Sequence, residues 1–380
     1  VERIGLPDTV LHYERTDGRR LRKDVAVADH DAALRLLCAT LVSAEHGVLP
    51  SLSAVEAIGH RVVHGGERLH ESLAVTPEVK AVIRECADLA PLHNPPNLGG
   101  IEACERVFPG VPNVAVFDTA FHHTMPPASY LYAIPYEYYA KYGIRKYGFH
   151  GTSHKFVAHA TAEFLGRPLT ELKLITAHLG NGASITAVER GRVLDTSMGM
   201  TPLNGLVMGT RSGDIDPAVV LYLARRGMTA DEIDHLLNKR SGLLGVSGIG
   251  SGDMRDNVAA AESGHAQAQL AIRMFVHRLV SYVGAYHTIL GGADALVFTG
   301  GIGENSAYIR ARVVGQLACL GCHLDETQNA AVAGRAALIS TAESTLKAVV
   351  MPTNEELMIA RETARVLAAP AGALGTEDRK

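Results

Sequence analysis

Hydrophobic and polar positions in this chain repeat with two different periods. Val10–Arg15 and Arg20–Val27 flank Asp17-Gly18, a dipeptide typical of a two-residue turn, and predict a β-hairpin. Apolar residues three and four positions apart predict helices at Asp31–Ala44, Pro77–Leu89, Leu98–Val107, Pro217–Arg226, Ala230–Lys239, Arg255–Thr288, Ala307–Leu320 and Glu355–Leu367. Short apolar runs predict strands at Ala57–Val63, Asn113–Phe117, Leu172–His178, Ala183–Val188, Arg192–Ser197, Ala295–Phe298 and Ala348–Met351.

The alternation of strands and helices predicts an α/β protein. Three strands followed by helix and strand occur clearly once, in the second half of the chain. The first half shows only the later part of this order: a hairpin, a helix, a strand, helices and a strand. If the protein contains two copies of one unit, the first copy lacks an opening strand and turn, the counterpart of Leu172–Gly182.

Composition excludes several classes of protein. Hydrophobic residues make up 47% and charged residues 20% of 380 residues, which is typical of globular domains. The net charge of −4 gives no broad cationic field, so binding to nucleic acid is not expected. The longest apolar stretch, Leu279–Ala293, is shorter than the roughly 20 residues of a membrane span. Five scattered cysteines imply no disulfide framework and favour a cytoplasmic location.

One cysteine motif has two interpretations. Cys319–His323 fits the C-x-x-C-H spacing of covalent haem attachment. The alternative is a helix that ends at Gly321 in the left-handed conformation, and it is favoured because the chain has no export-signal pattern.

Three glycine-rich loops could approach phosphate groups, because glycine lets backbone N–H groups come close to oxygen. They are Leu179–Gly182, Gly245–Gly252 and Gly300–Glu304. No lysine follows a glycine, so a Walker A loop is excluded. Protein-kinase motifs, a G-x-S-x-G elbow, a Rossmann fingerprint and paired zinc motifs are also not found. A polar loop is expected at Ile144–His154, before a helix that ends near Leu165.

Polar side chains lie where predicted strands end or in the loops that follow. Each has an ordinary structural interpretation, such as an ion pair, a turn cap or a histidine bonded to backbone. Ligands bind at the carboxyl ends of strands in α/β sheets, so the set as a whole favours a functional site. These residues are Arg61, Asp118, His150, Asn181 and Arg211.

At this point the sequence resembles the acetate kinases. Eight motifs occur in the family's order, and the resemblance extends from Val1 to about Leu367. The motifs are Gly59–Gly66, Pro91–Asn97, Phe117–His122, Tyr147–His154, His178–Gly182, Met208–Asp214, Gly300–Asn305 and Pro352–Glu356.

The resemblance implies reversible, ATP-dependent phosphorylation of acetate to acetyl phosphate, with Mg²⁺ or Mn²⁺. It implies two ribonuclease H-like domains of the actin and sugar-kinase type around an interdomain cleft, and a homodimer. The closing helix should return to the first domain. The expected domains are therefore residues 1–119 with 356–380, and residues 120–355.

The resemblance also implies roles for individual residues. Arg61 and Arg211 would hold the carboxylate and the transferring phosphoryl group, and His150 and Asn181 would stabilise that group. Asp118 would orient other groups, and Glu355 would lie on the metal side. The acetate pocket would comprise Arg61, Val63, Leu92, His93 and Pro202. The nucleotide positions would be His178, Leu179, Gly180, Asn181, Gly182, Asp253, Met254, Arg255, Gly301, Ile302, Gly303, Glu304 and Asn305.

The chain departs from the family pattern at its start. Family members open with a strand and a Gly-Ser-rich turn near the phosphates, and nothing here matches that segment. Either the sequence omits part of the native protein, or the polypeptide is a shortened form with weak or absent activity. The alternatives to acetate kinase are a kinase for propionate or other short-chain fatty acids, an inactive nucleotide-binding form, and a purely structural dimer.

Overall fold

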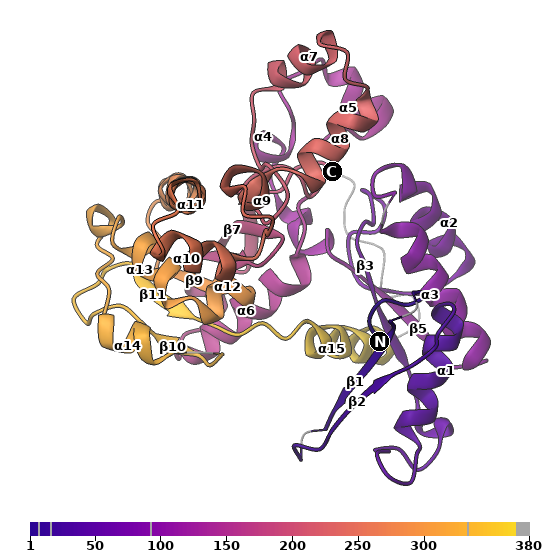
Figure 1. The fold of residues 1–380 in the computed structure, drawn as a ribbon. Coiled ribbons are helices and arrows are strands. Elements are labelled where there is room, and N and C mark those ends of the chain that lie inside the picture. The colour runs from indigo at the N-terminus through magenta and orange to yellow at the C-terminus, as the bar shows by residue number, and fades with distance from the viewer. Residues whose placement is uncertain (7, 16, 92, 333, 370–380) are drawn as a thin grey trace. The chain divides into compact units, whose positions relative to one another are not determined.

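The structure is a computed structural model, and it describes residues 1–369 except residues 7, 16, 92 and 333 and the side chain of His30. The chain forms two compact units. Unit 1 comprises Val1–Phe117 with Ile359–Lys380, and unit 2 comprises Asp118–Met358. The boundaries expected from the sequence fell after residues 119 and 355. Figure 1 shows the elements of both units.

A six-stranded sheet forms the centre of unit 2, with the strand order β10-β11-β9-β6-β7-β8. β6, β9 and β11 run parallel, and the other three strands pair antiparallel to their neighbours. Every residue of β9 is buried, as expected for a strand inside a parallel sheet. The strands are β6 (Lys173–Leu179), β7 (Ala183–Glu189), β8 (Arg192–Thr196), β9 (Ala295–Thr299), β10 (Ala337–Leu338) and β11 (Lys347–Val350).

One face of this sheet changes from apolar to polar along its strands. Alternate residues of β6 point to the same face, so Leu174, Thr176 and His178 share it. At the apolar end, Leu174 joins a buried cluster with Val157 of α6 (Gly151–Phe164). At the polar end, the first turn of α6 meets the hydroxyl and imidazole groups of the strands. This gradient places titratable groups at the carboxyl end of β6.

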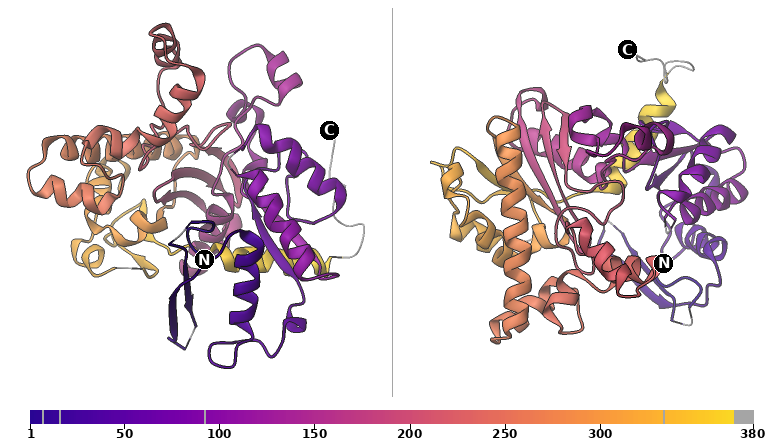
Figure 2. Two further views of the ribbon diagram at one scale, coloured as in Figure 1. Left: turned by 45° about the vertical axis from the view of Figure 1, so that its right-hand side comes forward. Right: turned by 90° about the horizontal axis from the view of Figure 1, so that it is seen from above.

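Helices surround the sheet of unit 2. The long helix α11 (Ala266–Ile289) packs on β6 and β7. It lies across the strands from α6 in Figure 1 and is seen lengthwise in the right-hand view of Figure 2. The other helices of unit 2 are α4 (Pro127–Tyr130), α5 (Tyr136–Tyr142), α7 (Pro217–Arg225), α8 (Ala230–Lys239), α9 (Gly242–Ser247), α10 (Met254–Glu262), α12 (Gly300–Asn305), α13 (Ala307–Val314) and α14 (Glu326–Ala331).

Unit 1 contains two small sheets. The predicted hairpin is confirmed: β1 (Val10–Glu14) pairs antiparallel with β2 (Arg20–Asp24). The second sheet has the order β3-β5-β4, in which β3 and β5 are parallel. Its strands are β3 (Ile58–Val62), β4 (Leu73–Ala74) and β5 (Asn113–Phe117), and its helices are α1 (His30–Leu41), α2 (Pro77–Glu85) and α3 (Asn94–Val107).

The closing helix α15 (Glu355–Ala368) packs against β5. Ile359 and Val366 contact Val114 and Val116 of that strand. The approach to β3 is close: a β-carbon on Gly59 would lie 2.5 Å from side-chain atoms of Ile359 and Thr363. Glycine in β3 therefore permits this packing.

The sheets of the two units differ in one way that the order of elements predicts. In unit 2, β6 pairs with both β7 and β9. Among the described strands of unit 1, β1 pairs with β2 and β3 pairs with β5, and none takes the place of β6.

Several predicted boundaries are wrong, and local chemistry explains why. The single helix expected at Arg255–Thr288 is two helices, because Gly264 adopts a positive φ and His265 caps α11. α6 begins at Gly151, inside the expected loop, and the glycine loop after β9 is the short helix α12. Gly321 has the predicted left-handed conformation but follows a 3₁₀ turn, Ala318–Leu320. In the described part of the chain, no helix has both the length and the apolar character of a membrane span.

Candidate active site

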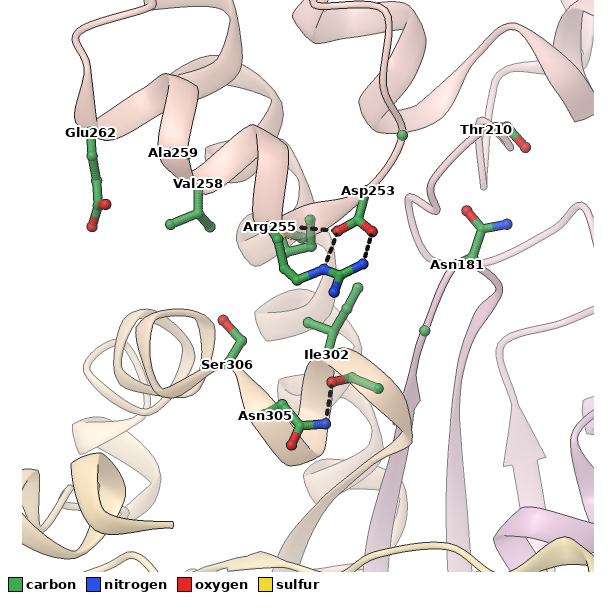
Figure 3. Close-up of a pocket in the computed structure, with 14 residues that line it drawn as sticks. Asn181, Thr210, Asp253, Arg255, Val258, Ala259, Glu262, Ile302, Asn305 and Ser306 are labelled. Carbon is green, nitrogen blue, oxygen red and sulfur yellow. Dashed lines mark hydrogen bonds and ion pairs between the residues drawn. The ribbon is translucent and has the colours of Figure 1, made fainter. Parts of the chain in front are cut away.

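Unit 2 contains a cavity of about 760 Å³, a size typical of small-ligand sites. Figure 3 shows its walls, which come from the β6–β7 turn, the start of α10 and the region of α12 and α13. The lining residues are Gly180, Asn181, Thr210, Gly252, Asp253, Met254, Arg255, Val258, Ala259, Glu262, Gly301, Ile302, Asn305 and Ser306. Eight of the thirteen positions predicted to bind nucleotide are among them.

The first wall is built on the N-terminus of α10. The Asp253 carboxylate accepts a hydrogen bond from the backbone N–H of Arg255 at 2.8 Å and caps the helix. The Arg255 guanidinium donates to the same carboxylate at 3.1 and 2.6 Å. These bonds hold the pKa of Asp253 below its usual value. Asp253 and Arg255 therefore form an ion pair, in which the Arg255 guanidinium is the exposed cation on this wall (Figure 3).

The opposite wall is α12, and its shape depends on Glu304. The Glu304 carboxylate accepts hydrogen bonds from the backbone N–H of Gly300 at 2.9 Å and of Thr353 at 3.1 Å. Glu304 was predicted to bind nucleotide, and in the structure its Oε1 holds the loop together. Gly303 packs against the backbone of Phe298, so the lining residues of α12 are Gly301, Ile302 and Asn305.

A buried arginine supports the same wall from behind. Arg310 has no exposed surface, and its guanidinium donates to the carbonyl oxygens of Gly303 at 3.0 Å and Glu304 at 2.8 Å. It also donates to the side chain of Asn329 at 2.8 Å. Burial lowers the pKa of Arg310. These bonds fix the end of α12.

The turn between β6 and β7 forms one end of the cavity. The backbone N–H of Gly180 donates to the carbonyl of Gly182 at 3.0 Å, and that of Gly209 donates to the carbonyl of Asn181 at 2.9 Å. A β-carbon on Gly209 would clash with the Asn181 side chain. Glycine at this position therefore brings the Met208–Asp214 loop against the turn.

Arg211 lies on this loop, which α11 holds in place. Tyr282 donates to the Asp214 carboxylate at 2.7 Å, and Arg278 donates to the carbonyl of Asp214 at 3.2 Å. Asp214 in turn accepts from the backbone N–H of Gly205 at 2.7 Å. Burial lowers the pKa of Arg211, which remains a cation because guanidinium is ionised throughout the physiological range.

His150 and Arg211 approach the same point. A β-carbon on Gly182 would lie 3.5 Å from His150 Nε2 and 3.4 Å from Arg211 Nη1. The ring of His178 stacks on that of His150, with centroids 4.3 Å apart. His150 is the N-cap of α6 and has φ 58°. Such left-handed backbone is costly for a non-glycine residue and is often found at functional sites.

Asp118 is fully buried beside the first turn of α6. Its carboxylate accepts a hydrogen bond from the Thr152 hydroxyl at 3.0 Å, and its carbonyl accepts from the backbone N–H of Gly151 at 2.9 Å. Asp118 therefore orients the turn that carries His150.

The predicted acetate residues are distributed over both units. Val63 is buried, and its backbone N–H donates to the Asn97 side chain at 3.0 Å, while Arg61 is exposed on β3. His93 is the N-cap of α3. Pro202 is half-buried in unit 2, and Leu92 lies outside the described residues.

The predicted metal residue Glu355 opens α15. The loop before it is tied to α6, because Ser153 Oγ lies 2.8 Å from both Thr353 Oγ1 and His178 Nδ1. Among the described residues, no group of three or more histidine, cysteine, aspartate and glutamate side chains could hold a metal ion. Mg²⁺ is usually held by one or two carboxylates together with substrate phosphates, so the oxygen donors of Glu355 and Asp118 fit this metal.

Part of the pocket wall on α10 was not predicted from the sequence. Val258, Ala259 and Glu262 line it together with Arg255. These positions are i, i+3, i+4 and i+7 from Arg255, so they share one face of a helix. That periodicity was readable once Asp253 and Arg255 were placed at the helix start. Thr210, Gly252 and Ser306 also line the pocket. Thr210 and Gly252 lie in a motif and a glycine-rich loop noted in the sequence, but none of the three was a predicted site residue.

Known proteins are similar to this chain over almost its whole length. A sequence model described as the acetokinase family matches residues 1–361. The acetate kinase of Caldicellulosiruptor saccharolyticus is 54% identical over 369 residues, which cover 97% of this chain and 92% of that protein. The acetate kinase of Methanosarcina mazei is 50% identical over 366 residues, covering 96% and 89%.

Solved structures are also similar. The acetate kinase of Porphyromonas gingivalis has a TM-score of 0.91 at 45% identity and covers 96% of this chain and 92% of its own. A propionate kinase from Francisella tularensis has a TM-score of 0.89 at 44% identity, with coverages of 96% and 91%. These matches confirm the predicted α/β fold of the actin and sugar-kinase type. The chain belongs to the acetokinase family.

Proposed function

We propose that this protein catalyses reversible, ATP-dependent phosphorylation of acetate to acetyl phosphate by direct in-line transfer. The observation that carries this proposal is the convergence of His150 Nε2 and Arg211 Nη1 over Gly182. The point of convergence adjoins Asn181, which lines the end of a cavity of nucleotide size. The names of the relatives give further support.

ATP or ADP occupies the cavity in this proposal. The phosphates lie at the Gly180–Asn181 end, where the Asn181 side chain lines the cavity as a hydrogen-bond donor. The nucleoside extends past Arg255 toward the wall formed by Gly301 and Ile302. Phosphoryl transfer needs mainly positioning and charge stabilisation, and guanidinium and imidazole N–H groups provide both for equatorial oxygens.

The acceptor needs no general base. A carboxylic acid with an ordinary pKa near 4 is ionised at neutral pH, so acetate is already a nucleophile. Asp118 therefore has an orienting role, in keeping with its hydrogen bonds to Thr152 and Gly151.

We assign acetate and metal binding to the residues expected from the sequence. Arg61, Val63, Leu92, His93 and Pro202 would bind acetate. Glu355 would hold Mg²⁺ or Mn²⁺ together with the nucleotide phosphates. When bound, the metal neutralises charge on those phosphates.

We further propose a cytoplasmic homodimer. The five cysteines are free, as is usual in a reducing compartment. Exposed apolar side chains suited to an interface lie on α5 (Tyr136 and Tyr142) and α7 (Leu221 and Tyr222). Light scattering should give twice the mass of one chain.

Acetyl phosphate can be trapped as its hydroxamate to test the activity. A hydroxamate product should form only when ATP, Mg²⁺ and acetate are all present. If purified protein binds ATP in a calorimeter but forms no product, it is a nucleotide-binding protein without kinase activity. If it binds no ATP, the enzymatic proposal is wrong altogether.

Propionate is a second candidate substrate, because one solved relative is called a propionate kinase. One methylene in an apolar pocket changes binding by only about 1–3 kcal/mol. Comparing kcat/KM for acetate, propionate and butyrate in the same assay decides between them. We expect acetate to give the highest value, and a higher value for propionate would reassign the substrate.

A further inference from the structure

A serine hydroxyl on β7 bridges two histidines of unit 2. Ser184 Oγ lies 2.9 Å from His150 Nδ1 and 2.7 Å from His154 Nε2. The other nitrogen of His154, Nδ1, lies 2.7 Å from Thr176 Oγ1. Ser184, His154 and Thr176 have no exposed surface. The four side chains thus form a hydrogen-bonded chain that ends at His150.

The hydrogen atoms in this chain are interdependent. Ser184 has one hydroxyl hydrogen and can donate it to only one of the two histidines. The other histidine must then donate its own ring N–H to Ser184 Oγ. If Ser184 donates to His150 Nδ1, the proton of a neutral His150 is on Nε2. In that arrangement His154 carries its proton on Nε2, and its Nδ1 accepts from Thr176.

We propose that His154 and Ser184 are positioning residues that hold His150 in the tautomer with its proton on Nε2. This inference rests on the proposed function. His150 Nε2 lies near the same point as the Arg211 guanidinium, where the transferring phosphoryl group would lie. A phosphoryl oxygen needs a donor there, and the opposite tautomer would present a lone pair to an anion.

The surroundings of His154 fit a donor that carries no charge. Its neighbours include two further histidine rings, His122 at 5.7 Å and His178 at 6.4 Å between centroids. Complete burial and these two rings keep the pKa of His154 well below its ordinary value. His154 therefore stays neutral, with one N–H to donate.

An ordinary buried histidine would also satisfy both of its nitrogens. Two observations distinguish the hydrogen-bonded chain of four side chains from an ordinary buried histidine. Ser184 Oγ is shared with a residue at the candidate phosphoryl site, so its hydrogen cannot be assigned without affecting His150. The backbone of His150 is also held at φ 58°, a conformation that persists where the surroundings hold it, and its ring stacks on that of His178 at 4.3 Å.

Nitrogen NMR of protein labelled with ¹⁵N-histidine tests the tautomer directly and does not depend on activity. The His150 signals, assigned by their loss in His150→Gln, should show the proton on Nε2 in the unmodified chain. Ser184→Ala should remove this preference. A proton on Nδ1 in the unmodified chain overturns the proposal.

Kinetics test the consequence for transfer. Ser184→Ala should lower kcat by roughly tenfold to a hundredfold, the range seen when the hydrogen-bond partner that orients a metal-ligating histidine is removed. KM for ATP and acetate should change little, because His150 acts on the transferring group. Thr186→Val, on the same face of β7 but outside the chain of four, is the matched control with kcat near that of the unmodified protein.

A double variant separates positioning from general stability. If Ser184 acts through His150, adding Ser184→Ala to His150→Ala should cause no further loss of kcat. An equal loss in both backgrounds means a merely structural role and overturns the proposal. His154→Gln, with an amide donor near the position of Nε2, should keep more activity than His154→Asn, which is too short.

Failure of the proposed function gives a different result. An unmodified protein that forms no acetyl phosphate rejects the kinase assignment, while the NMR measurement still decides the tautomer. If the unmodified protein is active and folded Ser184→Ala has an unchanged kcat, only the positioning role of Ser184 and His154 is rejected.

Discussion

Arg211 is the residue whose replacement best tests the transfer step. Its guanidinium is partly buried beside Gly182 and His150, and its loop is fixed by α11. Arg211→Ala removes a cationic donor from the phosphoryl position, which should lower kcat on the order of 10²–10³-fold. ATP affinity should change little, because the walls around Asp253 and Gly301 are untouched. Steady-state kinetics and calorimetric ATP titration measure the two effects separately.

The control for Arg211 is Arg240→Ala, which removes an exposed arginine one loop away. It should leave both kcat and ATP affinity near those of the unmodified protein. Equal losses of kcat and ATP affinity in Arg211→Ala would contradict a role confined to the transition state.

Individual site residues could be predicted where they belong to a sequence motif. Their roles were less predictable where hydrogen-bond partners distant in sequence decide them. The sequence placed His150 among the candidates, but its contact with Ser184 depends on the register of β6 and β7. Glu304 was predicted to bind nucleotide because the motif contains its carboxylate. The motif does not show that this carboxylate accepts a hydrogen bond from the Thr353 N–H. Short-range spacing cannot show either contact.

The packing of α15 on β3 gives a prediction about stability. Gly59→Ala places a methyl group 2.5 Å from Ile359 Cγ2 and Thr363 Oγ1. Overpacking of this kind typically costs about 1–3 kcal/mol, so the melting temperature should fall. Calorimetric melting of the variant measures the change.

Gly99→Ala on α3 is the matched control for that packing. A β-carbon there meets no atom within 4 Å, and alanine favours helix over glycine by roughly 0.5–1 kcal/mol. Its melting temperature should rise slightly. A Gly59→Ala protein as stable as the control would show that α15 does not approach β3 so closely.

Helices and strands were predicted well wherever the spacing of apolar residues kept one period, helical or strand-like, without interruption. β5, β7, β9, α8 and α15 lie within one or two residues of their expected bounds. The long helix at Arg255–Thr288 was wrong although Ser263-Gly264 is a typical turn dipeptide, because apolar residues continue at helical spacing on both sides. α12 was missed because its glycines suggested a loop, while the Glu304 carboxylate supplies the bonds that close it.

At the scale of the whole chain, the order of elements predicted a strand arrangement in the second half that the first half does not repeat, and the described strands agree with this. Three strands before the first crossover marked unit 2, and the topology has β6 between β7 and β9. The polarity gradient on the α6 face was not predicted, although alternate residues of β6 and β7 contain it. Its consequence is a group of histidines buried in polar but mostly uncharged surroundings.

Buried histidines of both units predict how stability depends on pH. Burial lowers the pKa of His64 to about 4 and that of His122 to about 3, and the pKa of His154 is also lowered. Each has an ordinary pKa near 6.5 in the unfolded chain. Between these values the unfolded chain binds more protons than the native protein. The free energy of unfolding should therefore fall as the pH drops from about 6.5 toward 4, by about 1.4 kcal/mol per pH unit for each histidine.

Proton uptake measures this coupling without assuming a single unfolding transition. Calorimetric unfolding at pH 5.5 in two buffers of different ionisation enthalpy should show an uptake of roughly one proton per buried histidine. His64→Asn should reduce the uptake by about one proton. An uptake near zero, with equal stability at pH 7 and pH 5, would mean that the native protein protonates these histidines in place, and their burial would then not keep them neutral.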